Sequence, residues 1–171
     1  MENISNLPSA TSGMESIRQI EETVASYIAM KGYEEAATLY DGSFAEAYFF
    51  YCFKNGKKNF FGKEFDDIAL HLKNYWQGVE DEYDIVLYNH VSVAIIEVKY
   101  KAHLKDIPAV LKKAETFRIL FPQYKDFKIY LGLATMSFYS ELEQECIEQG
   151  IAVIKQVGDK VVINDSNLKV F

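Results

Sequence analysis

The spacing of apolar side chains divides the chain into helical and strand-like stretches. Ser12 and Glu15 have the spacing of a capping box, and apolar residues then recur every three or four positions, which predicts an N-terminal helix over residues 13–32. The preceding residues 1–12 are rich in Asn and Ser and are expected to form a flexible leader. A second helix, rich in alanine and aromatic residues, is predicted over residues 43–53.

The rest of the pattern predicts a mixture of strands and helices. Three strand-like stretches come first, at residues 60–72, 83–88 and 93–102. They are followed by a helix that Pro108 opens and Pro122 ends, a strand at 128–136, a helix at 141–149, and a closing pair of strands at 151–157 and 160–163. The order αα-βββ-αβ-αββ, without repeats or linkers, predicts a single α/β domain (α+β, with a mixed sheet) over residues 1–171.

Length and composition agree with one domain that buries its own core. The chain has 171 residues, of which 49% are hydrophobic and 25% charged. No stretch reaches the roughly 20 apolar residues of a membrane span, and the N-terminus lacks the basic and apolar regions of a signal peptide. We therefore expect a cytoplasmic protein with no membrane partner. Cys52 and Cys146 are far apart and are expected to be reduced, packed thiols rather than zinc ligands.

Charge is distributed unevenly along the sequence. The net charge is −7, which argues mildly against indiscriminate binding to nucleic acid. Residues 99–128, however, contain eight basic and three acidic side chains. This segment could form a basic side on an otherwise acidic body.

The strands at 83–88 and 93–102 place two carboxylates opposite each other. If His90 and Val91 form a two-residue turn, the antiparallel register pairs Asp84 with Glu97. Opposed side chains in such a pair are about 5 Å apart at Cβ, and like charges there are destabilising. A divalent cation between the two carboxylates would offset that repulsion.

Alternation along the second strand adds further groups to the same face. Glu97 and Lys99 point to one side of the strand, Val98 points to the other, and the Val98 carbonyl lies between them. Hard oxygen ligands of this kind suit Mg²⁺ or Mn²⁺, which keep several waters. The alternative is a solvated salt-bridge ladder in which Glu82 faces Lys99. Glu97, however, interrupts a strongly apolar strand, where an unpaired charge is costly, and this favours the site.

Tyr83-Asp84 followed by Glu97-Val98-Lys99 resembles the D…E-x-K signature of the PD-(D/E)XK, or restriction-endonuclease-like, superfamily. The amino-acid sequence around these residues is similar to that of uncharacterised bacterial members, with Tyr83 in place of the family's proline. The resemblance covers residues 43–136 and implies an αβββαβ core, to which this chain adds an N-terminal helix and a C-terminal β-hairpin. It also implies a metal held by Asp84, Glu97 and the Val98 carbonyl.

The same resemblance implies an activity. In such nucleases a water on the metal attacks the scissile phosphorus, and Lys99 would orient or activate that water. A glutamate on the first core helix often joins the site, and by order it would be Glu46. Glu46 also has capping-box spacing from Ser43, so it could instead cap its own helix. Glu64 and Asp67 are the fallback candidates.

The expected substrate is nucleic acid, DNA rather than RNA. Lys101, Lys112 and Lys113 could contact phosphates, although an ordinary solvated helix face is the alternative for them. The function indicated is a Mg²⁺- or Mn²⁺-dependent endonuclease or exonuclease. The alternative function is a catalytically inactive nucleic-acid-binding or protein-interaction module, and the helix at 13–32 could pair two subunits in a homodimer.

Overall fold

The computed structural model describes residues 45–54, 59–157 and 160–171. It begins with a helix over residues 45–54. The strands that follow are β1 (Asn59–Phe60), β2 (Lys63–Glu64), β3 (Asp67–Trp76), β4 (Val79–Tyr88), β5 (Ser92–Lys99), β6 (Lys128–Thr135), β7 (Ala152–Val157) and β8 (Lys160–Asn164). The other helices are η2 (Leu104–Asp106), α3 (Ile107–Leu120), η3 (Pro122–Tyr124) and α4 (Ser140–Glu148).

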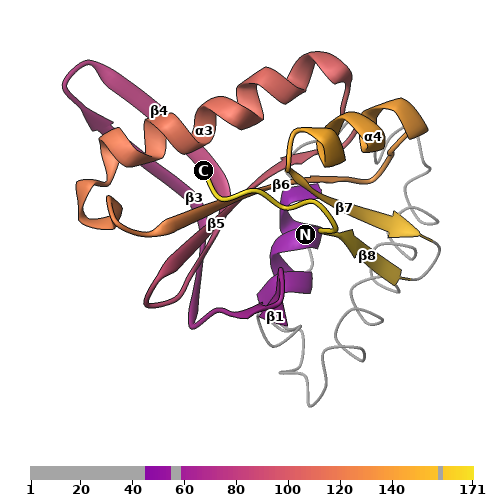
Figure 1. Cartoon of the computed structure of the whole chain (residues 1–171), viewed down its shortest axis with the longest axis horizontal. Helices are drawn as coiled ribbons and strands as arrows, with labels where there is room; N and C mark the ends of the chain where they lie inside the picture. The colour runs from indigo at the N-terminus through magenta and orange to yellow at the C-terminus, as the bar shows by residue number, and fades with distance from the viewer. Residues whose placement is uncertain (1–44, 55–58, 158–159) are drawn as a thin grey trace, which may run out of the picture.

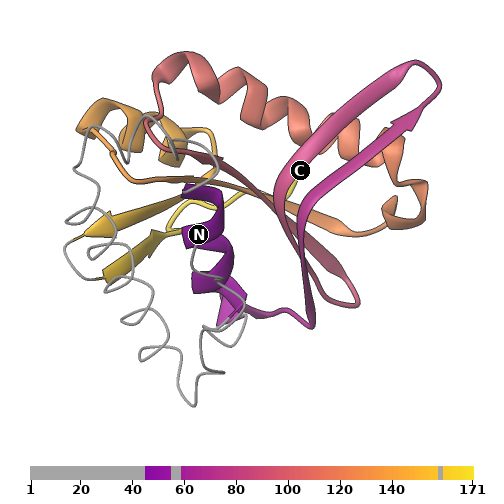
Figure 2. The same cartoon turned by 180° about the vertical axis from the view of Figure 1, so that it is seen from behind.

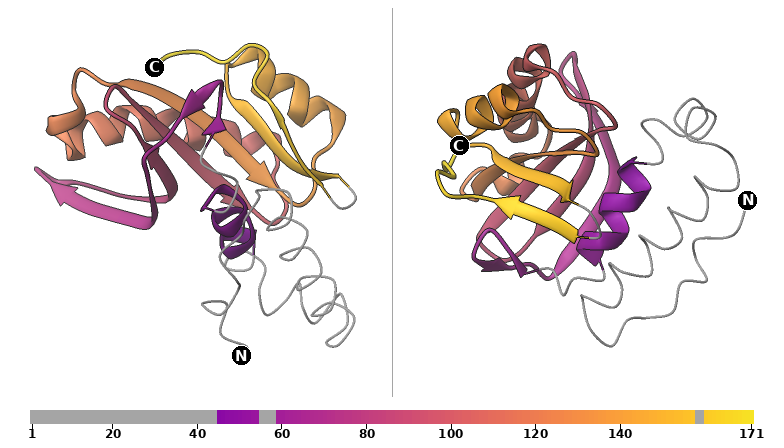
Figure 3. Two further views of the ribbon diagram at one scale, coloured as in Figure 1. Left: turned by 90° about the horizontal axis from the view of Figure 1, so that it is seen from below. Right: turned by 90° about the vertical axis from the view of Figure 1, so that its right-hand side faces the viewer.

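A six-stranded mixed sheet in the order β3-β4-β5-β6-β7-β8 forms the middle layer (Figure 1). The pairs β5–β6 and β6–β7 are parallel, and the remaining pairs are antiparallel. Helices α3 and α4 cover one face, and the helix at 45–54 covers the other, as the side view in Figure 3 shows. The predicted mixed α/β class is therefore confirmed.

Each face of the sheet has its own hydrophobic core. The helix at 45–54 buries Tyr48, Phe49 and Phe53 against one face, together with Ile85 and Ile96 of the central strands (Figure 2). On the opposite face, α3 and α4 bury a second set of residues that includes Phe117, Leu142, Val86, Ile95 and Leu131. Strands β5 and β6 are thus covered on both sides, which explains their nearly continuous apolar sequences.

The predicted order αβββαβ is confirmed from the helix at 45–54 through β6, and the C-terminal hairpin is confirmed as β7–β8. The predicted turn at His90 and Val91 is also confirmed, because β4 and β5 pair from Ile85 with Ile96 to Tyr88 with Val93. Cys52 and Cys146 are buried, reduced cysteines, one in each core, as expected. The leader at 1–12 and the helix at 13–32, with its proposed homodimer, lie outside the described residues.

Three predicted strand boundaries were wrong. The stretch 60–72 is not one strand, because Phe61 and Gly62 both have positive φ and turn β1 back onto β2 before β3 begins. Strand β4 starts four residues before Tyr83, since β3 and β4 continue outward as a hairpin around Gln77 and Gly78. Strand β5 ends at Lys99 instead of continuing to residue 102.

Side chains on β3 and β4 change faces at one rung of the ladder. Tyr83 packs in the core under α3 and Ile85 in the opposite core, although regular alternation would put both on one face. Ile68 and Leu72 of β3 divide in the same way. The change occurs at His71 of β3 and Asp84 of β4, which lie opposite each other but are not paired in the β3–β4 ladder. The backbone of His71 has a positive φ of +53°.

The outer half of the β3–β4 hairpin is fastened to α3. Thr116 donates a hydrogen bond of 2.6 Å to Asp81 and shares one of 2.8 Å with the Tyr83 hydroxyl, while Lys113 donates to Asp81 at 2.6 Å. Asn74 donates to the Leu120 carbonyl at 2.8 Å. These contacts hold a hairpin that projects beyond the body of the molecule (Figure 1). Its tip carries Tyr75 and Trp76, which are 64% and 54% exposed.

None of the helices in the described part of the chain is long and apolar enough to cross a membrane.

Candidate active site

The three strongest sequence candidates line one pocket. Its volume is about 360 Å³, and it lies where the helix at 45–54 meets β4 and the end of β5. The lining residues are Glu46, Asp84, Glu97, Val98, Lys99, Tyr100 and Lys101. The pocket thus brings together the predicted carboxylates and the predicted lysine, and it includes Glu46 from the helix.

Asp84 occupies the rung at which β3 and β4 change faces. Its Oδ2 accepts a hydrogen bond of 2.8 Å from the Val98 backbone N–H, which ties the middle of β4 to β5 just beyond their ladder. Burial raises the Asp84 pKa, although that hydrogen bond and the charge of Lys99 act against the rise. The strand irregularity therefore places a buried acid in the pocket instead of in a hydrophobic core.

Glu97 is the most perturbed carboxyl group of the pocket. Its side chain is 12% exposed, and Oε2 is buried and has no hydrogen-bond partner in the part of the chain that the structure describes. The nearest cations are Lys99 Nζ, 3.4 Å from Oε1, and Lys113 Nζ, 3.8 Å from Oε2. Burial first, and then the charge of Asp84, raise the Glu97 pKa to about 7. A divalent cation fits this arrangement, because it would supply the partner that the oxygen lacks.

Lys99 contacts Glu97 and is otherwise open to solvent, with 42% of its side chain exposed. The alternative of a salt-bridge ladder placed Glu82 opposite Lys99. In the structure the β4–β5 ladder stops at Ile85 with Ile96, so it does not include Glu82, whose carboxylate contacts His71. Lys99 is therefore held at the pocket by Glu97, with an ammonium that a bound molecule can reach.

Glu46 points from its helix into the pocket. Its Oε2 lies 3.0 Å from His71 Nε2, and burial followed by the charge of Asp84 raises its pKa. The capping alternative involves Ser43, which lies outside the described residues. The two fallback candidates do not line the pocket: Glu64 and Asp67 are both exposed, and Asp67 accepts a hydrogen bond from the N–H of Ile68.

The three predicted phosphate-binding lysines have different surroundings. Lys101 is exposed at the pocket, and Lys112 is exposed on α3. Lys113 is only 14% exposed, because its ammonium donates to Asp81 and to the Glu82 carbonyl, both at 2.6 Å. Lys113 therefore holds the β3–β4 hairpin and partly balances Glu97, which leaves Lys101 and Lys112 as the accessible members of the set.

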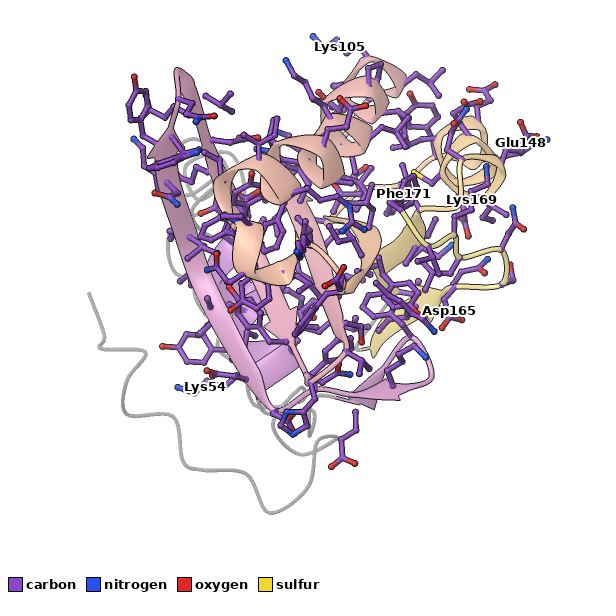
Figure 4. All side chains as sticks on the ribbon, turned by 60° about the vertical axis from the view of Figure 1, so that its left-hand side comes forward. Lys54, Lys105, Glu148, Asp165, Lys169 and Phe171 are labelled. Carbon is purple, nitrogen blue, oxygen red and sulfur yellow. The ribbon has the colours of Figure 1, made fainter. Side chains whose placement is uncertain are left out.

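The predicted basic segment is partly used inside the protein. Arg118 donates to the carbonyls of Lys125, Phe127 and Phe171, so it fastens the chain after α3 and the C-terminal segment. Lys105, by contrast, projects outward from η2, just before α3, as Figure 4 shows. The solvent-facing positive charge of residues 99–128 is therefore smaller than the sequence count suggests.

Sequence reasoning missed His71 and Glu82. His71 lies between two carboxylates, with Nε2 3.0 Å from Glu46 Oε2 and Nδ1 3.0 Å from Glu82 Oε1. The sequence signal for them is the dipeptide Gln77-Gly78. If it forms a two-residue turn, the resulting β3–β4 register brings residue 71 opposite residue 84.

Comparison with known proteins gives no family assignment: no family model and no curated protein matches the sequence. The solved structures with a distant similarity to this chain include two from bacteria. Can2 from Sulfobacillus thermosulfidooxidans, solved in complex with cyclic tetra-adenylate, is 17% identical over 66% of this chain and 29% of its own, with a TM-score of 0.45. VC1899 from Vibrio cholerae is 15% identical over 84% of this chain and 47% of its own, with a TM-score of 0.43. The chain thus spans less than half of either neighbour.

Proposed function

We propose that the protein is a metal-dependent nuclease of the PD-(D/E)XK type that hydrolyses phosphodiester bonds of DNA. The observation that carries the proposal is the buried Glu97 oxygen, which has no hydrogen-bond partner among the described residues and shares a pocket with Asp84 and Lys99. Burying two acids with raised pKa values beside an accessible ammonium lowers the stability of the folded protein, which a purely structural role does not explain. Such a cost is typical of a site that binds a cation and a charged substrate.

Each residue then has a distinct role. Asp84, Glu97 and the Val98 carbonyl would hold Mg²⁺ or Mn²⁺, with Glu46 as a further acid at the rim. When bound, the ion would polarise a water and stabilise charge on the phosphoryl oxygens. The Lys99 ammonium reaches the same space and would orient the attacking water or bind a non-bridging oxygen.

The accessible lysines suggest how a substrate would approach. Lys101 follows Lys99 at the pocket, and Lys112 lies on the exposed side of α3. Both are available to contact phosphates of the strand on either side of the scissile bond. Because the net charge is −7 and the slope of log affinity against log salt scales with the number of phosphate contacts, we expect weak binding whose affinity falls only modestly as salt rises.

The test is cleavage of labelled double-stranded DNA, single-stranded DNA and RNA by the full chain with Mg²⁺, Mn²⁺ or EDTA. Cleavage of DNA that requires a divalent ion and falls at least about a hundredfold in Lys99→Ala is the expected result. Lys128→Ala is the matched control, because Lys128 is exposed and pairs with Ser92 at the opposite end of β5. Equal cleavage by wild type and Lys99→Ala would refute the assignment, and salt-dependent DNA binding without cleavage in either metal would support the inactive binding module.

A further inference from the structure

His71 has the geometry of a metal ligand with a second residue to orient it. Nε2 faces Glu46 inside the site, and Nδ1 faces Glu82 on the adjacent strand, each at 3.0 Å. Metal-bound histidines almost always donate their other ring N–H to a carboxylate or carbonyl, which fixes the ring and its tautomer. Glu82 is placed to accept that hydrogen bond and leave Nε2 free to bind a cation.

Glu46, His71 and Asp84 come close enough together to share one ion. Each residue offers a ligand atom, and these three atoms all lie within 4.8 Å of one another. They come from the helix at 45–54, from β3 and from β4, so the tertiary fold assembles the group. The side chain of His71 is 46% exposed, which leaves an open side for water or substrate.

We propose that Glu46, His71 Nε2 and Asp84 hold a divalent transition-metal ion, with Glu82 orienting the histidine. The inference rests on the proposed function, because Asp84 is a ligand both in that proposal and in this one. It adds which metal ions the pocket would bind. Imidazole suits Fe, Ni, Cu and Zn, and the mixed set of one imidazole and two carboxylates also suits Mn²⁺, whereas Mg²⁺ and Ca²⁺ prefer oxygen alone. The nitrogen ligand therefore biases the pocket toward Mn²⁺-class ions over Mg²⁺.

The backbone at His71 allows a conservative test. Asparagine tolerates positive φ better than most residues, so His71→Asn keeps the strand conformation while removing the imidazole. His90→Asn and His103→Asn are matched controls, because the sequence has three histidines. His90 also lies near a carboxylate, 3.6 Å from Asp66, but it is fully exposed at the β4–β5 turn.

Mn²⁺ is the probe, added to the full chain and to each variant. Electron spin echo envelope modulation detects nitrogen bound to Mn²⁺, and the signal of free Mn²⁺ in ordinary spin-resonance spectra gives the affinity. We expect imidazole modulation in the wild type and both controls, its loss in His71→Asn, and weaker Mn²⁺ binding by about tenfold to a hundredfold in Glu82→Ala. Equimolar Mg²⁺ should displace little Mn²⁺ from the wild type.

The outcomes separate this inference from the proposed function. If Mn²⁺ binds without imidazole modulation while DNA cleavage still depends on Asp84 and Lys99, the nuclease proposal stands and the histidine ligand is refuted. If His71 modulation is present but no nucleic acid is cleaved with any metal, the metal site stands and the nuclease proposal falls. Complete displacement of Mn²⁺ by equimolar Mg²⁺ would overturn the selectivity, and unfolding curves verify that each variant is folded.

Discussion

Glu97→Gln should stabilise the folded protein at neutral pH, even though it removes a residue of the candidate site. The Glu97 pKa rises from its ordinary 4.5 to about 7, because the folded chain buries the carboxyl group beside Asp84. The folded state therefore binds this proton more tightly than the unfolded state does. Stability that is fully present below about pH 4.5 is lost as pH rises toward 7, and the total loss is about 3 kcal/mol. Glutamine has nearly the same shape and cannot ionise, so the variant lacks this loss.

The assay is chemical unfolding followed by far-ultraviolet circular dichroism, in EDTA, at about pH 5 and about pH 8. The advantage of Glu97→Gln over wild type should grow by about 2–3 kcal/mol between the two pH values. Glu115→Gln is the control, because Glu115 is an exposed residue of α3. Other titrating groups are common to both proteins and largely cancel in the difference. An advantage that stays constant across this pH range would refute the account of Glu97.

A divalent ion should raise the free energy of unfolding of the wild type more than that of Glu97→Gln. Binding to the folded state stabilises in proportion to the logarithm of ion concentration over the dissociation constant. Wild type should therefore gain stability when Mn²⁺ replaces EDTA at about pH 8, and Glu97→Gln should gain less. An equal gain in both proteins would mean that Glu97 does not face the bound ion.

Three further predictions concern the fold and the substrate surface. Thr116→Val removes the hydroxyl that links α3 to the β3–β4 hairpin, and it should lower the free energy of unfolding by about 1–3 kcal/mol, measured by urea unfolding. Gly132→Ala should cost about 1–3 kcal/mol in the same assay, because the added methyl would lie 3.0 Å from Ile154 Cδ1 in a packed core. Lys101→Ala and Lys112→Ala should each weaken DNA binding and reduce the slope of log affinity against log salt by about one; an unchanged slope in both would place the substrate elsewhere.

The central part of the fold could be predicted from the sequence because its signals are local. The alternation before and after His90 and Val91, with only two residues in the turn, leaves one register that buries both apolar faces. The predicted approach of Asp84 to Glu97 follows from that register. The pocket, the pKa values and the contact between Lys99 and Glu97 agree with it.

The outer half of the β3–β4 hairpin could not be predicted, because the helix that it packs against, α3, is distant in sequence. Residues 73–82 show no regular alternation, and Asp81 and Glu82 would be solvated charges in an isolated strand. The Asp81 carboxylate and the Glu82 backbone carbonyl accept hydrogen bonds from α3, where the donors Lys113 and Thr116 lie more than 30 residues later. His71 was missed together with this hairpin, because its position opposite Asp84 emerges only once the hairpin is recognised.

The exposed hairpin tip also decides what fluorescence can report. Trp76 is the only tryptophan, and it is already 54% exposed in the folded protein. Its emission should shift little when the two cores unfold, so intrinsic tryptophan fluorescence is a poor measure of global stability here. The same indole should respond when DNA or a partner protein covers the tip. A single natural fluorophore therefore provides a label-free sensor of contacts at the hairpin, separate from the unfolding signal.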